Sequence, residues 1–183
     1  TALQVIKAGL HVLVEKPFDP TEEEAGFLIA LAAKKSLSLA IGFELMFNPY
    51  VELLARVIQE IGLQEAELGR IKKIELNLLN ELLPGREIPR DINAFEDLGS
   101  RLLSILHRLF GAGQLKDIRN ADSNSEDIYE DASFECDFTT QDRTIPAVFR
   151  VSKNYKVNAA PVTDRSVKII TTKGNSIEVK LFA

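Results

Sequence analysis

The amino-acid sequence predicts an α+β protein in which a small parallel α/β sheet is followed by an open, mainly antiparallel sheet with helices on one face. Residues 1–43 alternate helical and strand patterns, which is typical of parallel strands joined by right-handed crossovers. Beyond residue 70, apolar side chains recur at every second position, as in strands with a single covered face. Because the pattern changes near residues 44–48, we predict two domains, residues 1–46 and 47–183.

Helices and strands alternate in the first domain. Thr21 and Glu24 fit a capping box, so a helix is expected to begin directly after Thr21. Gly9 is expected to follow the end of the preceding helix as its C′ residue. Both strands are apolar throughout, so we expect them to be buried on both faces. In chain order, the predicted elements are a helix over residues 1–8, a strand over 11–15, a helix over 22–33 and a strand over 37–43.

The second domain is expected to combine helices with one-sided strands. Asn48 as N-cap and Pro49 at the first helical position mark the start of a helix. Gly174 marks the turn of a late hairpin. The predicted elements are helices over residues 49–62 and 101–110, strands over 74–78, 132–138 and 145–151, a hairpin over 168–183, and polar loops over 84–91 and 122–131.

Composition and charge narrow the class of protein. The chain has 183 residues, 45% hydrophobic and 27% charged, which is ordinary for a globular protein. A formal net charge of −5 argues against a generic nucleic-acid or anionic-membrane surface. Cys136 is the only cysteine, which favours a reducing, cytoplasmic location. No apolar run approaches the ~20 residues of a membrane span. We therefore expect neither nucleic acid nor membrane as a partner.

The first functional candidate is the triplet Glu15-Lys16-Pro17, at the end of the first predicted strand. Ligands of doubly wound sheets bind at the carboxyl ends of parallel strands. Pro17 favours an extended backbone at Lys16, so the ammonium group would be aimed reproducibly. Such a cation can polarise a hydroxyl or carbonyl group, or hydrogen-bond a ribose. From residue types alone, an exposed strand end is the commoner explanation of this triplet.

The second candidate lies on the helix expected over residues 101–110. Arg101 and Ser104 stand one turn apart on its polar side, which Arg108 shares, while leucines and Phe110 form the apolar side. Arg101 carries a planar fork of donors that suits an anionic substrate group. The alternative is a solvent-facing stripe of an amphipathic helix, which the pattern alone favours.

Other motifs do not support a site. Gly111 and Gly113 lack the third glycine of a dinucleotide fingerprint and follow a helix instead of a strand. The acidic segment over residues 122–131 has neither the glycine nor the glutamate that a calcium loop needs. His11 and His107 have no cysteine or second histidine close in sequence, so no metal site is expected.

The segment "AGLHVLVEKPFDPTEEEAGFLIALAAKKSLSLAIGFELMFNPY" resembles the glucose–fructose oxidoreductase / inositol dehydrogenase / MocA (Gfo/Idh/MocA) family. Those enzymes share an AGKHVLVEKP-type strand, a helix, an apolar strand and a segment that ends in R-F-N-P. "LGRIKKIE" is similar to the family's G-x-I entry into the sheet, and "EDLGSRLLSILHRLFG" to its D-x-G-x-H-x-x-D helix. "VKIITTKGNSIEV" is similar to its late hairpin. The resemblance covers most of the chain, and the EKP stretch is its most specific part.

The resemblance implies a Rossmann nucleotide-binding domain joined to an open α+β domain. Residues 1–46 would be the C-terminal remnant of the first, and residues 47–183 the substrate and oligomerisation domain. NAD or NADP would carry the hydride, and the substrate would be a sugar, polyol or similar small hydroxy compound. Family members commonly pair through the open sheet, which implies a homodimer.

Site residues follow from the same resemblance. Lys16 would be the catalytic lysine beside nicotinamide and substrate, and Glu15, Lys16 and Pro17 would contact the cofactor. Arg101 and Ser104 would line the substrate side.

The sequence departs from the family pattern at positions that matter for chemistry. Arg101 replaces the histidine that exchanges a proton with the substrate, and arginine cannot act as a general base at neutral pH. Ser104 replaces the family's aspartate, and Met46 replaces the arginine of R-F-N-P. The strand and glycine-rich turn that hold the pyrophosphate are expected upstream of Thr1, so tight NAD(P) binding by this chain is not expected.

Two hypotheses remain. The first is a fragment, or a naturally reduced member, of an NAD(P)-dependent oxidoreductase, inactive by itself. The second is a non-catalytic binding or homodimerisation module derived from that family. An upstream strand followed by G-x-G-x-x-G would favour the first, and a start codon directly before Thr1 would favour the second.

Overall fold

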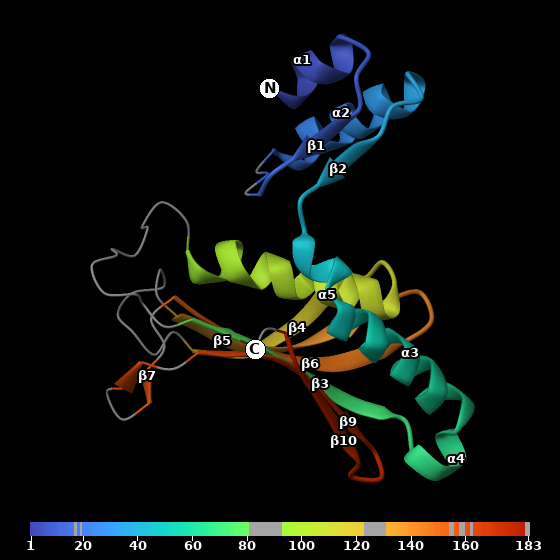
Figure 1. The fold of residues 1–183 in the computed structure, drawn as a ribbon, viewed down its shortest axis with the longest axis vertical. Helices are drawn as coiled ribbons and strands as arrows, with labels where there is room; N and C mark the ends of the chain where they lie inside the picture. Colours follow the sequence, from blue (N-terminus) through green and yellow to red (C-terminus); the bar gives the residue numbers. More distant parts are fainter. Residues whose placement is uncertain are drawn as a thin grey trace. The chain divides into compact units, whose positions relative to one another are not determined.

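The computed structural model describes residues 1–16, 18, 20–80, 93–122, 131–153, 156–157, 160–161 and 163–181. The chain forms two compact units, residues 1–44 and 45–183 (Figure 1). The first unit holds a two-stranded sheet, and the second is built on a six-stranded sheet.

The first unit has the predicted order of helix, strand, helix and strand. Its two strands run parallel, with Val12 opposite Leu39 and Val14 opposite Ile41. A small apolar cluster around Ile6 packs the helices against the strands. The elements are α1 (Ala2–Lys7), β1 (Val12–Val14), α2 (Glu22–Lys34) and β2 (Leu39–Ile41).

Local side chains fix the ends of the helices, as predicted. Thr21 Oγ1 accepts a hydrogen bond from the Glu24 N–H at 3.2 Å, and the Glu24 carboxylate accepts one from the Thr21 N–H at 2.9 Å. Asn48 Oδ1 accepts from the Tyr50 N–H at 2.9 Å, directly before the proline at the first helical position of α3 (Pro49–Leu63). Gly9 has a φ of +80°, the left-handed conformation that suits a residue just past a helix end. Each cap contributes about 1 kcal/mol.

The prediction that the strands of the first unit are buried on both faces is wrong. Leu13, in the middle of β1, is 68% exposed, whereas Val12 and Val14 are partly buried. The reason is that the helices pack only on the side that carries Val12 and Leu39. Further exposed apolar side chains of this unit are Leu10, Phe27 and Ile29. Parallel sheets are normally covered on both faces, whereas the face of this sheet that carries Leu13 is open to solvent.

The second unit contains a mixed sheet with the strand order β10-β9-β3-β6-β5-β4. All neighbours are antiparallel except β3 and β6, which run parallel with Leu76 opposite Phe149. The predicted late hairpin is confirmed, with Val179 opposite Val167. From residue 44 onward the elements are η1 (Glu44–Phe47), α3 (Pro49–Leu63), α4 (Glu65–Leu68), β3 (Ile71–Leu79), η2 (Phe95–Gly99), α5 (Ser100–Phe110), β4 (Gln114–Asp122), β5 (Asp131–Thr139), β6 (Thr144–Ser152), β7 (Lys156–Val157), β8 (Ala160–Pro161), β9 (Asp164–Thr171) and β10 (Ser176–Lys180).

The core of the second unit lies on the sheet face that α3 and α5 cover (Figure 1). The rings of Phe134 and Phe149 stack with centroids 4.9 Å apart, and Phe95 meets both edge-on. Burying a large apolar side chain contributes about 1.5–3 kcal/mol, so this covered face supplies most of the stabilisation. The fully buried side chains include Leu54, Ile74, Leu76, Leu102, Ile105, Phe138 and Ile169.

Strand β4 is an element that the sequence pattern does not reveal. Asp117 has a φ of +49°, and the pairing with β5 shifts register between Lys116 and Arg119. Such a bulge breaks the alternation by which a strand is recognised. The predicted polar loop over residues 84–91 lies outside the described residues, as do residues 123–130 of the predicted acidic loop.

Candidate functional site

Lys16 is the second residue after β1, at the carboxyl end of the parallel strand pair. Its side chain is partly buried, whereas Glu15 is exposed. The Gly42 N–H donates a hydrogen bond to the Val14 carbonyl at 2.9 Å, which keeps the ends of both strands together. Pro17 lies outside the described residues. The strand end therefore presents Glu15 and Lys16 where parallel sheets hold ligands.

The Glu15 carboxylate lies against Gly42. A Cβ atom at Gly42 would be 2.9 Å from Glu15 Oε2, closer than real contacts allow. Because Gly42 immediately follows β2, its missing side chain leaves room for the carboxylate across the end of the strand pair. A larger residue at position 42 would therefore require the exposed Glu15 carboxylate to shift.

The second candidate region begins with η2, a π-helical turn that leads into α5. Such turns frequently mark functional positions. Gly99 is buried in this turn, and a Cβ atom there would lie 2.1 Å from the Phe95 ring. Only glycine therefore fits beside this ring, which itself packs on Phe134 of the sheet. The turn is anchored to the core by that ring.

Asp97, on the same turn, forms an ion pair with Lys153, which immediately follows β6. Asp97 Oδ2 and Lys153 Nζ are 3.5 Å apart, and the two side chains are 30% and 8% exposed. A buried ammonium group is unfavourable without a counter-charge, so the pair stabilises Lys153 and joins the turn to the sheet. The more exposed Asp97 carboxylate retains a surface for a ligand.

Arg101 and Ser104 differ in their surroundings. Arg101 follows Asp97 by four residues, one helical turn, and is partly buried. Ser104 does not lie on a polar surface as expected, because it is 5% exposed. Its Oγ donates a hydrogen bond to the Arg101 carbonyl at 2.6 Å, which satisfies the hydroxyl within the helix. A contact between Ser104 and a substrate stays a prediction.

The structure brings Asp97, Arg101 and Lys153 into one region of the second unit, while Lys16 belongs to the first. Sequence reasoning selects Lys16, Arg101 and Ser104, includes Asp97 in the candidate motif without giving it a role, and misses Lys153. Asp97 carried a usable signal, since it stands one helical turn before Arg101. Lys153 carried none, because it comes from a distant strand that no local pattern connects to this helix.

Cysteine and metal chemistry find no support in the described part of the chain. Cys136 is buried, and this burial raises the pKa of its thiol to about 11, so the thiol is protonated at neutral pH. Among the residues that the structure describes, no three His, Cys, Asp or Glu side chains gather to hold a metal ion. No helix in the same residues has the length and apolar character needed to cross a membrane.

Comparison with known proteins finds oxidoreductases, although no family model matches the sequence. The chain is similar to the uncharacterized oxidoreductase YhhX of Escherichia coli K12, with 33% identity over 139 residues, 70% of this chain and 38% of YhhX. It is also similar to the UDP-N-acetylglucosamine 3-dehydrogenase of Acidithiobacillus ferrooxidans, with 32% identity over 107 residues, 58% of this chain and 30% of that enzyme. The chain spans less than half the length of either relative.

Solved structures share the fold of nearly the whole chain. GenD2 from gentamicin A biosynthesis, in complex with NAD, matches with a TM-score of 0.75 and 21% identity over 98% of this chain and 50% of GenD2. An inositol dehydrogenase homologue from Azotobacter vinelandii, complexed with NADH and myo-inositol, matches with a TM-score of 0.72 and 17% identity, covering 98% and 46%. The chain is a relative of the Gfo/Idh/MocA oxidoreductases. The predicted family resemblance and fold class are thereby confirmed.

In this Gfo/Idh/MocA relative, the Asp97–Lys153 pair can be tested by a double-mutant cycle. Asp97→Ala is expected to lower the free energy of unfolding by about 2 kcal/mol, because it leaves the buried Lys153 ammonium group less compensated. Asp97→Ala combined with Lys153→Met is expected to recover about 1 kcal/mol of that loss, because no buried charge remains. Urea unfolding followed by circular dichroism measures both values.

The matched control is the exposed pair of Glu52 and Arg108, whose side chains are 38% and 39% exposed. Glu52→Ala is expected to cost less than about 1 kcal/mol. Additive losses in the Asp97/Lys153 double variant would show that the two residues are not energetically coupled.

Proposed function

We propose that this chain is part of a cytoplasmic NAD(P)-dependent oxidoreductase that acts on a sugar, polyol or similar small hydroxy compound. The observation that carries the proposal is the position of Lys16, two residues after β1 at the carboxyl end of a parallel strand pair, in a fold shared with a solved UDP-N-acetylglucosamine 3-dehydrogenase. Ligands of open α/β sheets bind outside such strand ends. Similarity to a sugar-nucleotide dehydrogenase and to a fold solved with NADH and myo-inositol supports this substrate class.

Lys16 is assigned to the substrate oxygen. Bound NAD(P) would take a hydride from the carbinol carbon as the hydroxyl group becomes a carbonyl. The Lys16 ammonium group would donate a hydrogen bond to that oxygen and stabilise the negative charge that develops on it. Glu15 and Pro17 flank Lys16 and are the proposed contacts to the cofactor.

The hydroxyl proton needs an acceptor, and Arg101 cannot provide one. Arginine stays protonated at neutral pH, so Arg101 would orient a substrate oxygen without removing a proton. Asp97 is a carboxylate one helical turn away, partly exposed and paired with Lys153. Within the second unit, Asp97 is the proposed proton acceptor, and Arg101 and Ser104 are the proposed substrate contacts.

We expect the first unit to lack a site for the pyrophosphate of a dinucleotide. Gly9 follows a helix, Gly26 lies within α2, and Gly42 follows the last strand of the first unit. None of these described glycines forms the strand-to-helix G-x-G-x-x-G turn that receives a pyrophosphate. Residues 1–183 are therefore proposed to hold NAD(P) weakly by themselves.

Titration calorimetry of the 183-residue chain with NADH and with NADPH is expected to detect no micromolar binding, because the phosphate anchor is missing from the described residues. A complete NAD-dependent dehydrogenase in the same buffer is the positive control. Micromolar binding by this chain alone would contradict the proposal.

In the longer oxidoreductase that contains this chain, Lys16→Ala is expected to lower kcat/KM for sugar or polyol oxidation by about 100-fold or more, because one charge-stabilising donor is lost. Steady-state kinetics measure this, and calorimetry should show NADH affinity little changed. Lys34→Ala, at the end of α2, is the matched control and should leave kcat/KM unchanged. Full activity in the Lys16→Ala enzyme would remove Lys16 from the mechanism.

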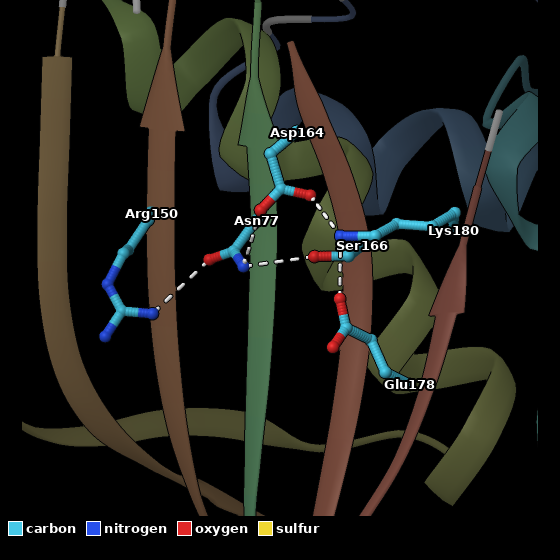
Figure 2. A network of polar contacts seen from close by, with 6 residues as sticks. All are labelled: Asn77, Arg150, Asp164, Ser166, Glu178 and Lys180. Atoms are coloured by element: carbon cyan, nitrogen blue, oxygen red, sulfur yellow. Dashed lines mark hydrogen bonds and ion pairs between the residues drawn. The ribbon is translucent and has the colours of Figure 1, made fainter. Parts of the chain in front are cut away.

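A second proposal concerns the face of the six-stranded sheet opposite α3 and α5. We propose that two copies of the chain pair through this face. Figure 2 shows that polar side chains from four adjacent strands bond one another across it. Arg150 donates to Asn77 Oδ1 at 3.4 Å, and Asn77 Nδ2 donates to Ser166 Oγ at 3.1 Å. Lys180 Nζ lies 2.8 Å from Asp164 and 2.7 Å from Glu178.

Charges on this face compensate one another. The hydrogen bond from Lys73 lowers the pKa of Glu75, and Arg150 and Lys168 act in the same direction. Hydrogen bonds to Asp164 and Glu178 raise the pKa of Lys180. A face whose charges are already paired can be covered at a smaller desolvation cost than one with isolated charges. Six strands of about eight residues present roughly 600 Å² of flat area, close to the ~800 Å² per partner of a stable interface.

Arg150→Glu is expected to raise the dissociation constant of the dimer at least tenfold. In a two-fold symmetric interface, each copy would contribute one new negative charge. Light scattering or analytical ultracentrifugation over a wide concentration range measures the monomer–dimer equilibrium. Arg56→Glu, on the helical layer, is the matched control and should leave it unchanged. A monomeric unmodified chain at every concentration would refute the dimer.

A further inference from the structure

We propose that a groove between α3 and the C-terminal end of α5 binds a small anion, a phosphate or carboxylate group carried by a small molecule. Its volume is about 500 Å³, within the range of small-ligand sites. Arg56 and Gln59 from α3, Arg108 from α5 and Arg143 from the turn between β5 and β6 line it. A second hollow of about 590 Å³ continues past Arg143 toward Arg70.

Two arginines of this groove differ from the others in the described part of the chain. Arg70 is paired with Glu65, Arg119 lies 3.0 Å from Asp137, and other arginines are likewise engaged. The side chains of Arg56 and Arg143 form no hydrogen bond or ion pair with any residue that the structure describes. Both of these unengaged guanidinium groups line the same groove.

The third arginine of the groove, Arg108, is held in place by an ion pair. Arg108 Nε and Nη2 lie 2.7 and 2.5 Å from the two carboxylate oxygens of Glu52, a bidentate pair that orients the side chain. With Arg108 neutralised in this way, Arg56 and Arg143 remain as cations on the groove, and Asp142 lies on the side of the second hollow. Planar guanidinium forks match the oxygens of phosphate and carboxylate groups.

The groove is separate from the region assigned to oxidoreductase chemistry. Asp97 and Arg101 lie at the N-terminal end of α5, whereas Arg108 and Phe110 lie at its C-terminal end. A helix of 11 residues is about 16 Å long, so one small ligand does not reach both. Anion binding in this groove can therefore be tested independently of the proposed oxidoreductase function.

The test is a titration of the 183-residue chain with inorganic phosphate and, separately, with acetate, at constant ionic strength set with chloride. NMR of the arginine Nε–Hε groups is expected to show saturable shifts at Arg56 and Arg143 with at least one of the anions. The anion that gives them identifies the group as phosphate or carboxylate. Arg56→Gln combined with Arg143→Gln is expected to raise the Kd, followed at the Phe110 amide, at least about tenfold.

Arg119→Gln is the matched control, because it removes an arginine that is already paired with Asp137 on β5. Its affinity for the anion should equal that of the unmodified chain. The absence of saturable shifts with either anion would overturn the site. An equal loss of affinity in Arg119→Gln would overturn it too, because the binding would then reflect net charge alone. Both substituted groove residues are exposed, so circular dichroism is expected to show an unchanged fold.

Discussion

The second unit depends on the burial of one face of its six-stranded sheet under α3 and α5. Side chains from β3, β5, β6 and β9 on that face are almost completely excluded from solvent. Each large apolar side chain so placed contributes about 1.5–3 kcal/mol, whereas an exposed ion pair such as Glu52–Arg108 contributes about 0–1 kcal/mol. The apolar contacts therefore decide the fold, and the polar groups take positions that this core allows.

The region around Asp97 shows how the core positions chemistry. Leu98 and Leu102 are buried on either side of Gly99 in sequence, and the Phe95 ring fills the space that a side chain at Gly99 would need. These contacts hold the π-helical turn against the sheet. Asp97 is thereby held next to the ammonium group of Lys153. Lys153 lies far from Asp97 in the sequence, so local sequence patterns do not predict this contact.

Features that depend on neighbouring residues were predictable from sequence, and features that depend on distant ones were not. The capping box of Thr21 and Glu24 and the N-cap at Asn48 follow from local hydrogen bonding, and both are present. Strand β4 was not predicted because the bulge near Asp117 interrupts the alternation of apolar and polar side chains. The exposure of Leu13 was not predicted because the sequence of an apolar strand does not show whether helices cover one face of it or both. The role of Lys153 was not predicted because an ion pair between a strand end and a distant helical turn produces no periodic pattern in the sequence.

The central position of β3 has a consequence for how the chain folds. Its hydrogen-bonding partners are β6 and β9, which follow it by many residues, and it has no strand neighbour close in sequence. During synthesis, residues 71–79 must therefore wait until residues 164–171 have left the ribosome before both edges of β3 are satisfied. Sheets with such long-range pairing fold slowly and expose unpaired strand edges on the way. The apolar residues of β3 thus stay without their strand partners until most of the chain has been made.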